Sequence, residues 1–195
     1  MADNTQAVQK LYIEYFQRPA DPEGLKFWVD ALNGNSNPNL LAQIEHDFAT
    51  SAEYNATYSG MSNREMIQKV YNNVFGRTAD TEGLNFWTNA LDTHSISVET
   101  MVREIVKGAQ TAQNEDAIVF NGRVAVATEF TTHIDTQAEI DAYLKPNGFK
   151  IASDYVGDVV DLGSAARAMQ PSLIDDAIAQ IVGTPTATAE VAHIA

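Results

Sequence analysis

The side chains best suited to chemistry occur as the same set at two places in the chain. Each set holds an arginine, two acids, a glycine and a tryptophan: Arg18, Asp21, Glu23, Gly24 and Trp28, and again Arg77, Asp80, Glu82, Gly83 and Trp87. An arginine beside carboxylates is suited to binding an anionic ligand, and grouped carboxylates are suited to binding a metal ion. We favour the structural alternative for both. The arginine would close a corner by bonding the last carbonyls of one helix and the acid that opens the next.

A second group of acids lies near the end of the chain. It consists of Asp154, Asp158 and Asp161, with Asp175 and Asp176 further on. Calcium is the one cofactor that such oxygen ligands suggest, but the group lacks the loop spacing and the glycine of a calcium-binding hand. A solvated helix face is therefore the favoured interpretation, with a calcium site at the first three residues as the alternative.

The sequence contains no catalytic constellation. The histidines, His46, His94, His133 and His193, are far apart and lack the spacing of metal ligands. Neither a phosphate-binding loop nor a nucleophile elbow is present, and the absence of cysteine excludes thiolate chemistry and disulfides. We therefore expect a protein that is not an enzyme.

Both sets of candidate residues lie in an internal repeat, which determines the elements that position them. Residues 11–32 and 70–91 are offset by 59 positions (77 − 18) and are identical at 12 of 22 positions. In each copy, apolar residues recur on a helical period up to the arginine, and an aspartate then acts as the N-cap of a new helix. The repeat therefore predicts a helix, a corner and a second helix in each copy.

Two features of the second helix call for a reason. Asn33-Gly34 predicts that the first copy of this helix ends in a left-handed residue. Glycine inside a helix costs about 1 kcal/mol relative to alanine. Since Gly24 and Gly83 both carry that cost, we expect another backbone or a large ring to lie against each of them.

A third helix completes each copy, over about 40–54 in the first and 98–106 in the second. The expected fold is all-α, with two stacked three-helix units at about 5–59 and 64–113. Both tryptophans lie in the repeat, so its aromatic residues are predicted to form the core: Tyr12, Tyr15, Phe16, Phe27 and Trp28, with their second-copy counterparts.

The region 114–183 is also expected to be helical. Asn121-Gly122 would ordinarily signal a hairpin, but Phe120, Val124 and Ala127 share a helical face, so we favour a helix and keep the hairpin as the alternative. Further helices are predicted at 136–144, from about 151 to 162, and at 165–182 with an interruption near Pro171.

Composition limits the class of protein. The chain has 195 residues, of which 45% are hydrophobic, and no apolar run long enough to span a membrane. Its first residues lack the pattern of a signal peptide. A net charge of −14 argues against nucleic-acid binding. The same negative charge is consistent with high solubility, which is the interpretation that we favour. It is also consistent with weak divalent-cation binding and with charge-regulated assembly.

The pattern (L/V)-Y-x-x-x-F-x-R-x-A-D-x-E-G-L-x-F-W-x-x-A-L resembles the DUF4214 family, here in two tandem copies. That all-helical module occurs in bacterial surface-layer proteins and in large secreted calcium-binding proteins. The phycobilisome linker domain is more loosely similar. Residues 120–127 are similar to a helix that often follows these modules in secreted relatives. The resemblance implies a scaffolding role at the cell surface or outside the cell, and no catalytic residues. The glycine–aspartate repeats that bind calcium in many relatives are absent.

The tail, 184–195, contains one charged residue and ends in small and apolar residues. Together with the resemblance, it predicts an uncleaved signal for type I secretion, with an ordinary frayed tail as the alternative. We therefore expect a bacterial protein exported to the surface or matrix, which self-assembles into a layer or filament, with calcium as one way to bridge copies. The alternative is a soluble adaptor that binds a protein or a cell-surface glycan without polymerising.

Overall fold

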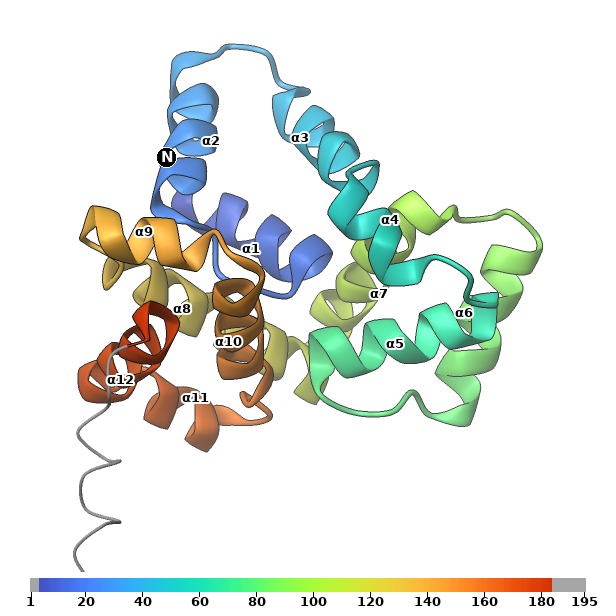
Figure 1. Cartoon of the computed structure of the whole chain (residues 1–195). Helices are drawn as coiled ribbons and strands as arrows, with labels where there is room; N and C mark the ends of the chain where they lie inside the picture. Colours follow the sequence, from blue (N-terminus) through green and yellow to red (C-terminus); the bar gives the residue numbers. More distant parts are fainter. Residues whose placement is uncertain (1–3, 184–195) are drawn as a thin grey trace, which may run out of the picture.

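Helices make up the whole regular structure of residues 4–183, the part of the chain that the computed structural model describes (Figure 1). In this part there are twelve helices and no strand, so the predicted all-α class is confirmed. The predicted secretion signal at 184–195 lies outside the described residues.

The first copy of the repeat forms four helices: α1 (Asn4–Phe16), α2 (Pro22–Gly34), α3 (Leu40–Ala49) and α4 (Ala52–Tyr58). As predicted, Asp21 caps α2, because its carboxylate accepts a hydrogen bond from the Gly24 backbone N–H at 2.6 Å. Pro22 follows at the first helical position, where its missing N–H costs nothing.

Two details of this copy differ from prediction. The prediction of a single helix over 40–54 is wrong. Ser51 caps a new helix there, because its side chain accepts a hydrogen bond from the Tyr54 N–H. The left-handed end expected at Asn33-Gly34 is also wrong. The C-cap of α2 is Asn35, which is extended (φ −119°, ψ 134°) and leads directly into the loop before α3.

The second copy forms α5 (Asn63–Phe75), α6 (Thr81–Asp92) and α7 (Val98–Ala112), and α8 (Glu115–Thr132) follows it as the first helix of the C-terminal region. Asp80 caps α6 through the Gly83 N–H at 2.8 Å, as Asp21 caps α2. Matching side-chain hydrogen bonds also join the first and second helices of each copy: Asn4 to Asn33 at 2.8 Å, and Asn63 to Asp92 at 2.6 Å.

The remaining helices are α9 (Gln137–Tyr143), α10 (Pro146–Gly157), α11 (Leu162–Ala168) and α12 (Pro171–Val182). The chain breaks before Pro171, as predicted. Asn121-Gly122 lies within α8, so the helix is confirmed and the hairpin is wrong. Gly122 permits close packing, since a Cβ there would lie 3.2 Å from the Ala165 Cβ.

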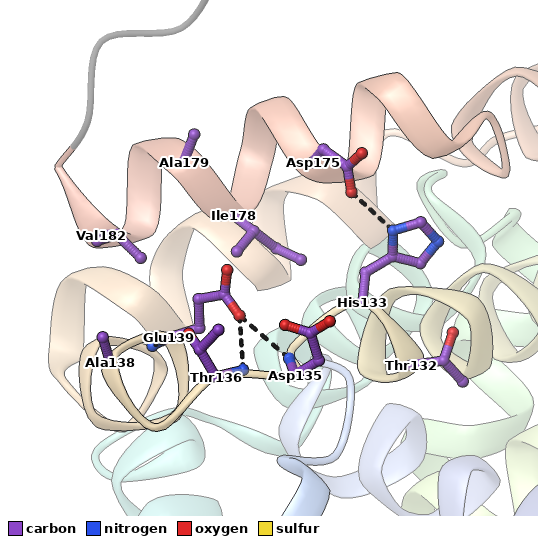
Figure 2. Close-up of a pocket in the computed structure, with 10 residues that line it drawn as sticks. All are labelled: Thr132, His133, Asp135, Thr136, Ala138, Glu139, Asp175, Ile178, Ala179 and Val182. Atoms are coloured by element: carbon purple, nitrogen blue, oxygen red, sulfur yellow. Dashed lines mark hydrogen bonds and ion pairs between the residues drawn. The ribbon is translucent and has the colours of Figure 1, made fainter.

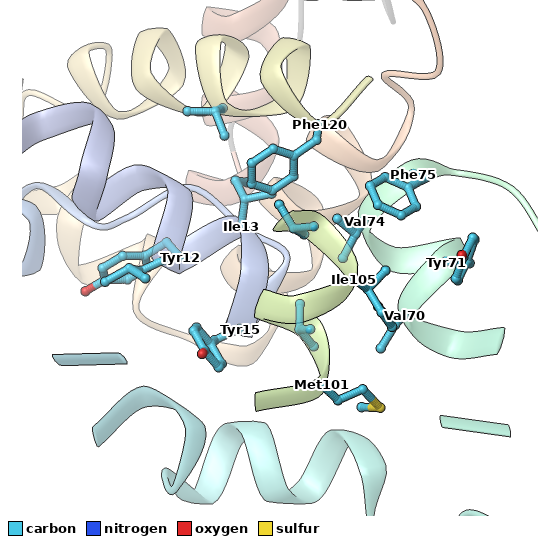
Figure 3. Close-up of a cluster of buried hydrophobic side chains, with 14 of the residues drawn as sticks. Tyr12, Ile13, Tyr15, Val70, Tyr71, Val74, Phe75, Met101, Ile105 and Phe120 are labelled. Carbon is cyan, nitrogen blue, oxygen red and sulfur yellow. The ribbon is translucent and has the colours of Figure 1, made fainter. Parts of the chain in front are cut away.

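The main core crosses the boundary between the repeat and the C-terminal region. It includes buried side chains of α1, α5 and α7 together with Phe120, Val124 and Ala127 of α8. Figure 3 shows Phe120 beside Ile13 of α1 and near Val74 of α5. A smaller core joins α8 to α9, α10 and α12. Thus α8 is the central element, which holds the repeat copies and the C-terminal helices together.

Candidate functional site

Arg18 joins the end of α1 to the first turn of α4. Its guanidinium donates two parallel hydrogen bonds to the Glu53 carboxylate, at 3.0 and 3.1 Å, and a third to the Pro19 carbonyl at 3.3 Å. Glu53 is the second residue of α4, where a carboxylate also meets the positive end of the helix dipole. We call the surroundings of Arg18 the first corner.

Arg77 makes the equivalent contacts in the second copy, which we call the second corner. It donates to both oxygens of Asp116, at 2.6 and 2.7 Å, and to the Thr78 carbonyl at 2.9 Å. Asp116 is the second residue of α8, as Glu53 is of α4. Both arginines are therefore anchors between a helix end and the start of a later helix.

The acid that each arginine binds differs from the predicted one. The aspartate or glutamate that opens the next helix was expected to pair with each arginine, but Asp21 and Asp80 cap that helix instead. Arg77 also forms a longer ion pair with Asp80, at 3.7 Å. The true partners follow a capping residue by two positions, in Ser51-Ala52-Glu53 and in Asn114-Glu115-Asp116. That shared pattern was the available signal in the sequence.

The repeated glycines lie against tyrosine hydroxyls. A Cβ at Gly24 would lie 2.5 Å from the Tyr12 hydroxyl, and one at Gly83 would lie 2.8 Å from that of Tyr71. The predicted large ring beside each glycine is therefore confirmed. The indole of the repeated tryptophan also hydrogen-bonds the same hydroxyl: Trp28 to Tyr12, and Trp87 to Tyr71.

The two corners differ in what covers them. The side chain of Arg18 is 7% exposed, because the ring of Phe149 in α10 lies 4.0 Å from its guanidinium carbon. Tyr143 of α9 lies beside it and donates a hydrogen bond to the Pro19 carbonyl. The side chain of Arg77 is 40% exposed. Within residues 4–183, Tyr71 alone places a ring over it, at 5.0 Å.

Phe27 and Phe86 face solvent rather than the core. They occupy the same position in the two copies, on α2 and α6, and are 62% and 64% exposed. Their prediction as core residues is wrong. Each precedes a tryptophan that packs against the core, and the side chains of successive helical residues point about 100° apart, which turns the phenylalanine outward. Each ring instead packs edge-on against that tryptophan, with centroids 4.8 and 4.9 Å apart.

The remaining acids of the repeat, Glu23 and Glu82, are exposed in the first turns of α2 and α6. Their carboxylates stabilise these helices by lying near the positive end of the helix dipole.

The acids proposed as calcium ligands are not brought together. Asp161 caps α11, Asp154 pairs with Lys150 at 2.5 Å, and Asp158 lies at the end of α10. Over residues 4–183, no group of three or more histidine, cysteine or acidic side chains is arranged to hold a metal ion. The arrangement therefore gives no support to the alternative of a calcium site at these three residues.

A pocket lies where the end of α8 meets α9 and α12 (Figure 2). At its edge, His133 Nδ1 lies 2.7 Å from a carboxylate oxygen of Asp175, and its Nε2 lies 3.6 Å from Glu129. The hydrogen bond that the protonated ring donates to Asp175 raises the pKa of His133. Sequence spacing missed this pair because the two residues are 42 positions apart. The contact holds α12 against α8.

Arg123 is a structural residue to which the sequence assigned no role. It is 2% exposed and donates hydrogen bonds to the carbonyls of Asn73, Gly157 and Val159. Burial lowers its pKa to about 10. It thereby joins α8 to the ends of α5 and α10.

In the described part of the chain, no helix is long and apolar enough to cross a membrane.

Comparison with protein families gives one match. The model of a family described as "Domain of unknown function (DUF4214)" matches residues 46–113. This span contains the second copy of the repeated motif and not the first, whereas the sequence resemblance predicted two. The match carries nothing about surface layers, secretion or phycobilisome linkers. No similar protein is found among curated proteins, and none among solved structures.

Proposed function

We propose that this chain is a non-enzymatic structural protein that associates with copies of itself, and that it does so outside the bacterial cell. The observation that carries the proposal is the pair of exposed rings, Phe27 and Phe86, at the same position of two similar helices. Burial of such a side chain at a contact contributes about 1.5–3 kcal/mol. Their conspicuous exposure therefore favours a contact with another surface.

The repeat supports self-association rather than a single contact. α2 and α6 present the same residue type on similar helices, so one molecule offers two related faces. A contact between different faces of identical copies leaves one face free at each end, and such contacts extend into open arrays.

The net negative charge opposes this association and makes it depend on cations. Copies that each carry a net charge of −14 repel one another. Divalent cations weaken that repulsion without a dedicated site, so calcium would favour assembly by acting between acidic surfaces.

The location outside the cell rests on what the resemblance to the family implies, because the match of residues 46–113 names the family and carries nothing about location. Removal of residues 184–195 is the direct test, because the proposed signal lies there. Export of the shortened chain at the level of the full chain would exclude that signal.

Particle size tests the self-association. Light scattering and electron microscopy of the purified full chain, first with EDTA and then with millimolar calcium, are expected to show growth that calcium increases. The double variant Phe27→Ser and Phe86→Ser is expected to remain monomeric. Met169→Ser removes another exposed apolar side chain, 41% exposed, and is expected to behave as the unmodified chain.

The second candidate function is an adaptor that binds a protein or a glycan, since the same exposed rings would serve a foreign partner. A full chain that stays monomeric under all these conditions would favour the adaptor.

A further inference from the structure

Three Asn-Gly dipeptides occur in the sequence: Asn33-Gly34, Asn121-Gly122 and Asn147-Gly148. This dipeptide is chemically labile, because glycine has no side chain that keeps its backbone nitrogen away from the Cγ carbon of the asparagine. The nitrogen must come within about 3–3.5 Å of Cγ, and a helical backbone does not allow that approach. All three asparagines are exposed, so what holds the following glycine decides how well each site is protected.

Two of the glycines are held in place by neighbouring helices. A Cβ on Gly122, inside the 18-residue helix α8, would lie 3.2 Å from the Ala165 Cβ. Gly148 is buried in the first turn of α10, where a Cβ would lie 2.5 Å from the backbone oxygens of Ala142 and Tyr143. Unwinding the backbone at either site would break contacts between helices.

Gly34 differs, because it is the exposed last residue of α2 and a Cβ there would meet nothing within 4 Å. At the corresponding end of α6, the backbone N–H of Thr93 donates hydrogen bonds to the carbonyls of Asn89 and Leu91. Asn35, the C-cap of α2, is extended, and its N–H makes no such bond to the described residues. The last turn of α2 can therefore unwind at Gly34 without moving another helix.

We propose that Asn33 is a site of spontaneous deamidation. The Gly34 nitrogen attacks Asn33 Cγ, and the new N–Cγ bond replaces the Cγ–Nδ2 bond. Nδ2 takes up the proton of the Gly34 N–H and leaves as ammonia. One water then opens the cyclic succinimide. Cleavage of the new bond gives aspartate, and cleavage of the original peptide bond gives isoaspartate, in which the main chain runs through Cβ.

The side chain of Asn4 favours this reaction and fits its product. Its Nδ2 donates a hydrogen bond to Asn33 Oδ1 at 2.8 Å, so it stabilises the negative charge that this oxygen gains during the attack. In the second copy, Asn63 donates in the same way to Asp92, the residue that corresponds to Asn33, at 2.6 Å. An aspartate at position 33 therefore fits the same contact. The conversion adds one negative charge to a chain that carries −14.

Peptide mass spectrometry of the full chain tests the site, because the three asparagines fall on separate tryptic peptides. The folded chain is kept in slightly alkaline buffer for weeks and sampled at intervals, and fragment spectra locate each converted residue. We expect Asn33 to convert at least about tenfold faster than Asn121 and Asn147. A rate at Asn33 that does not exceed the other two would overturn the proposal.

Unfolding the chain separates the effect of the fold from that of the dipeptide. In concentrated urea, where the helices are lost, we expect the three sites to convert at similar rates. A preference for Asn33 that persists in urea would assign the lability to the local sequence and overturn the role of the end of α2.

Gly34→Ala is the matched variant, because it keeps Asn33 and places a methyl group beside the attacking nitrogen. It is expected to slow conversion at Asn33 about tenfold. The melting temperature should not fall, since the added Cβ meets nothing within 4 Å. An unchanged rate of conversion would show that the Gly34 nitrogen is not the attacking group.

Discussion

Among single residues, Glu14 combines a charge with burial. It is 8% exposed on α1, and the charged groups that act on it are Glu45 of α3, Lys10 of α1 and Arg103 of α7. Burial, with a further contribution from Glu45, raises its pKa to about 8. The folded protein therefore holds this carboxyl protonated near neutral pH.

Stability is expected to depend on pH through Glu14. Because its folded pKa is raised from 4.5, its contribution is fully present below about pH 4.5 and is lost as pH rises through about 8. Glu14→Gln, which resembles the protonated form, should exceed the unmodified chain in unfolding free energy by about 2–5 kcal/mol at pH 9 and by little at pH 4. Urea unfolding across this range measures the difference, with Glu23→Gln at an exposed site as the control. A difference that does not vary with pH would contradict the assignment.

Arg77 and Asp116 provide a second prediction for single residues. The Asp116 side chain is 8% exposed, so Arg77→Ala leaves a buried carboxylate without its partner. We expect a loss of about 3 kcal/mol in unfolding free energy. The double variant with Asp116→Asn should recover part of it, because the charge has then been removed. No recovery, measured by urea unfolding, would show that the pair is not coupled.

Between elements, the end of α9 lies close to α10 at Gly148. A Cβ there would lie 2.5 Å from the backbone oxygens of Ala142 and Tyr143, which cannot move without shifting α9. Gly148→Ala is therefore expected to lower the unfolding free energy by about 1–3 kcal/mol or more. It should also loosen the cover of Arg18, since Tyr143 and Phe149 belong to these two helices.

A matched control for Gly148 lies on the same helix. A Cβ on Gly157 would meet nothing within 4 Å, so Gly157→Ala should change stability little. Thermal unfolding followed by circular dichroism compares the two variants. An equal effect of both would mean that helix propensity, rather than the contact between α9 and α10, determines the outcome.

Local signals predicted the elements better than the contacts between them. Caps at Asp21 and Asp80, the break before Pro171 and the ring beside Gly24 follow from a few neighbouring residues, and the structure has them all. The partners of Arg18 and Arg77 lie 35 and 39 residues away. Each follows a capping residue by two positions, but that local pattern alone does not select them over the nearer acids.

The exposure of Phe27 shows the same limit. The repeated aromatic set placed two consecutive aromatic residues in the core, but packing of α2 against α1 decides which of them faces inward. The contact of His133 with Asp175 and the three carbonyls around Arg123 likewise depend on how distant helices meet.

For the whole molecule, the repeat gives two similar surfaces with different surroundings. The C-terminal helices cover the first corner and leave the second open. The two ends of the molecule therefore differ, which gives it a direction (a structural polarity). A filament needs that polarity, whereas two equivalent ends would favour closed dimers.

The central claim is self-association, and light scattering of the unmodified full chain across a concentration series tests it most directly. The account predicts a mass that rises continuously with concentration, passes beyond that of a dimer, and rises earlier when calcium replaces EDTA. The mass of one chain at every concentration, with and without calcium, would contradict it.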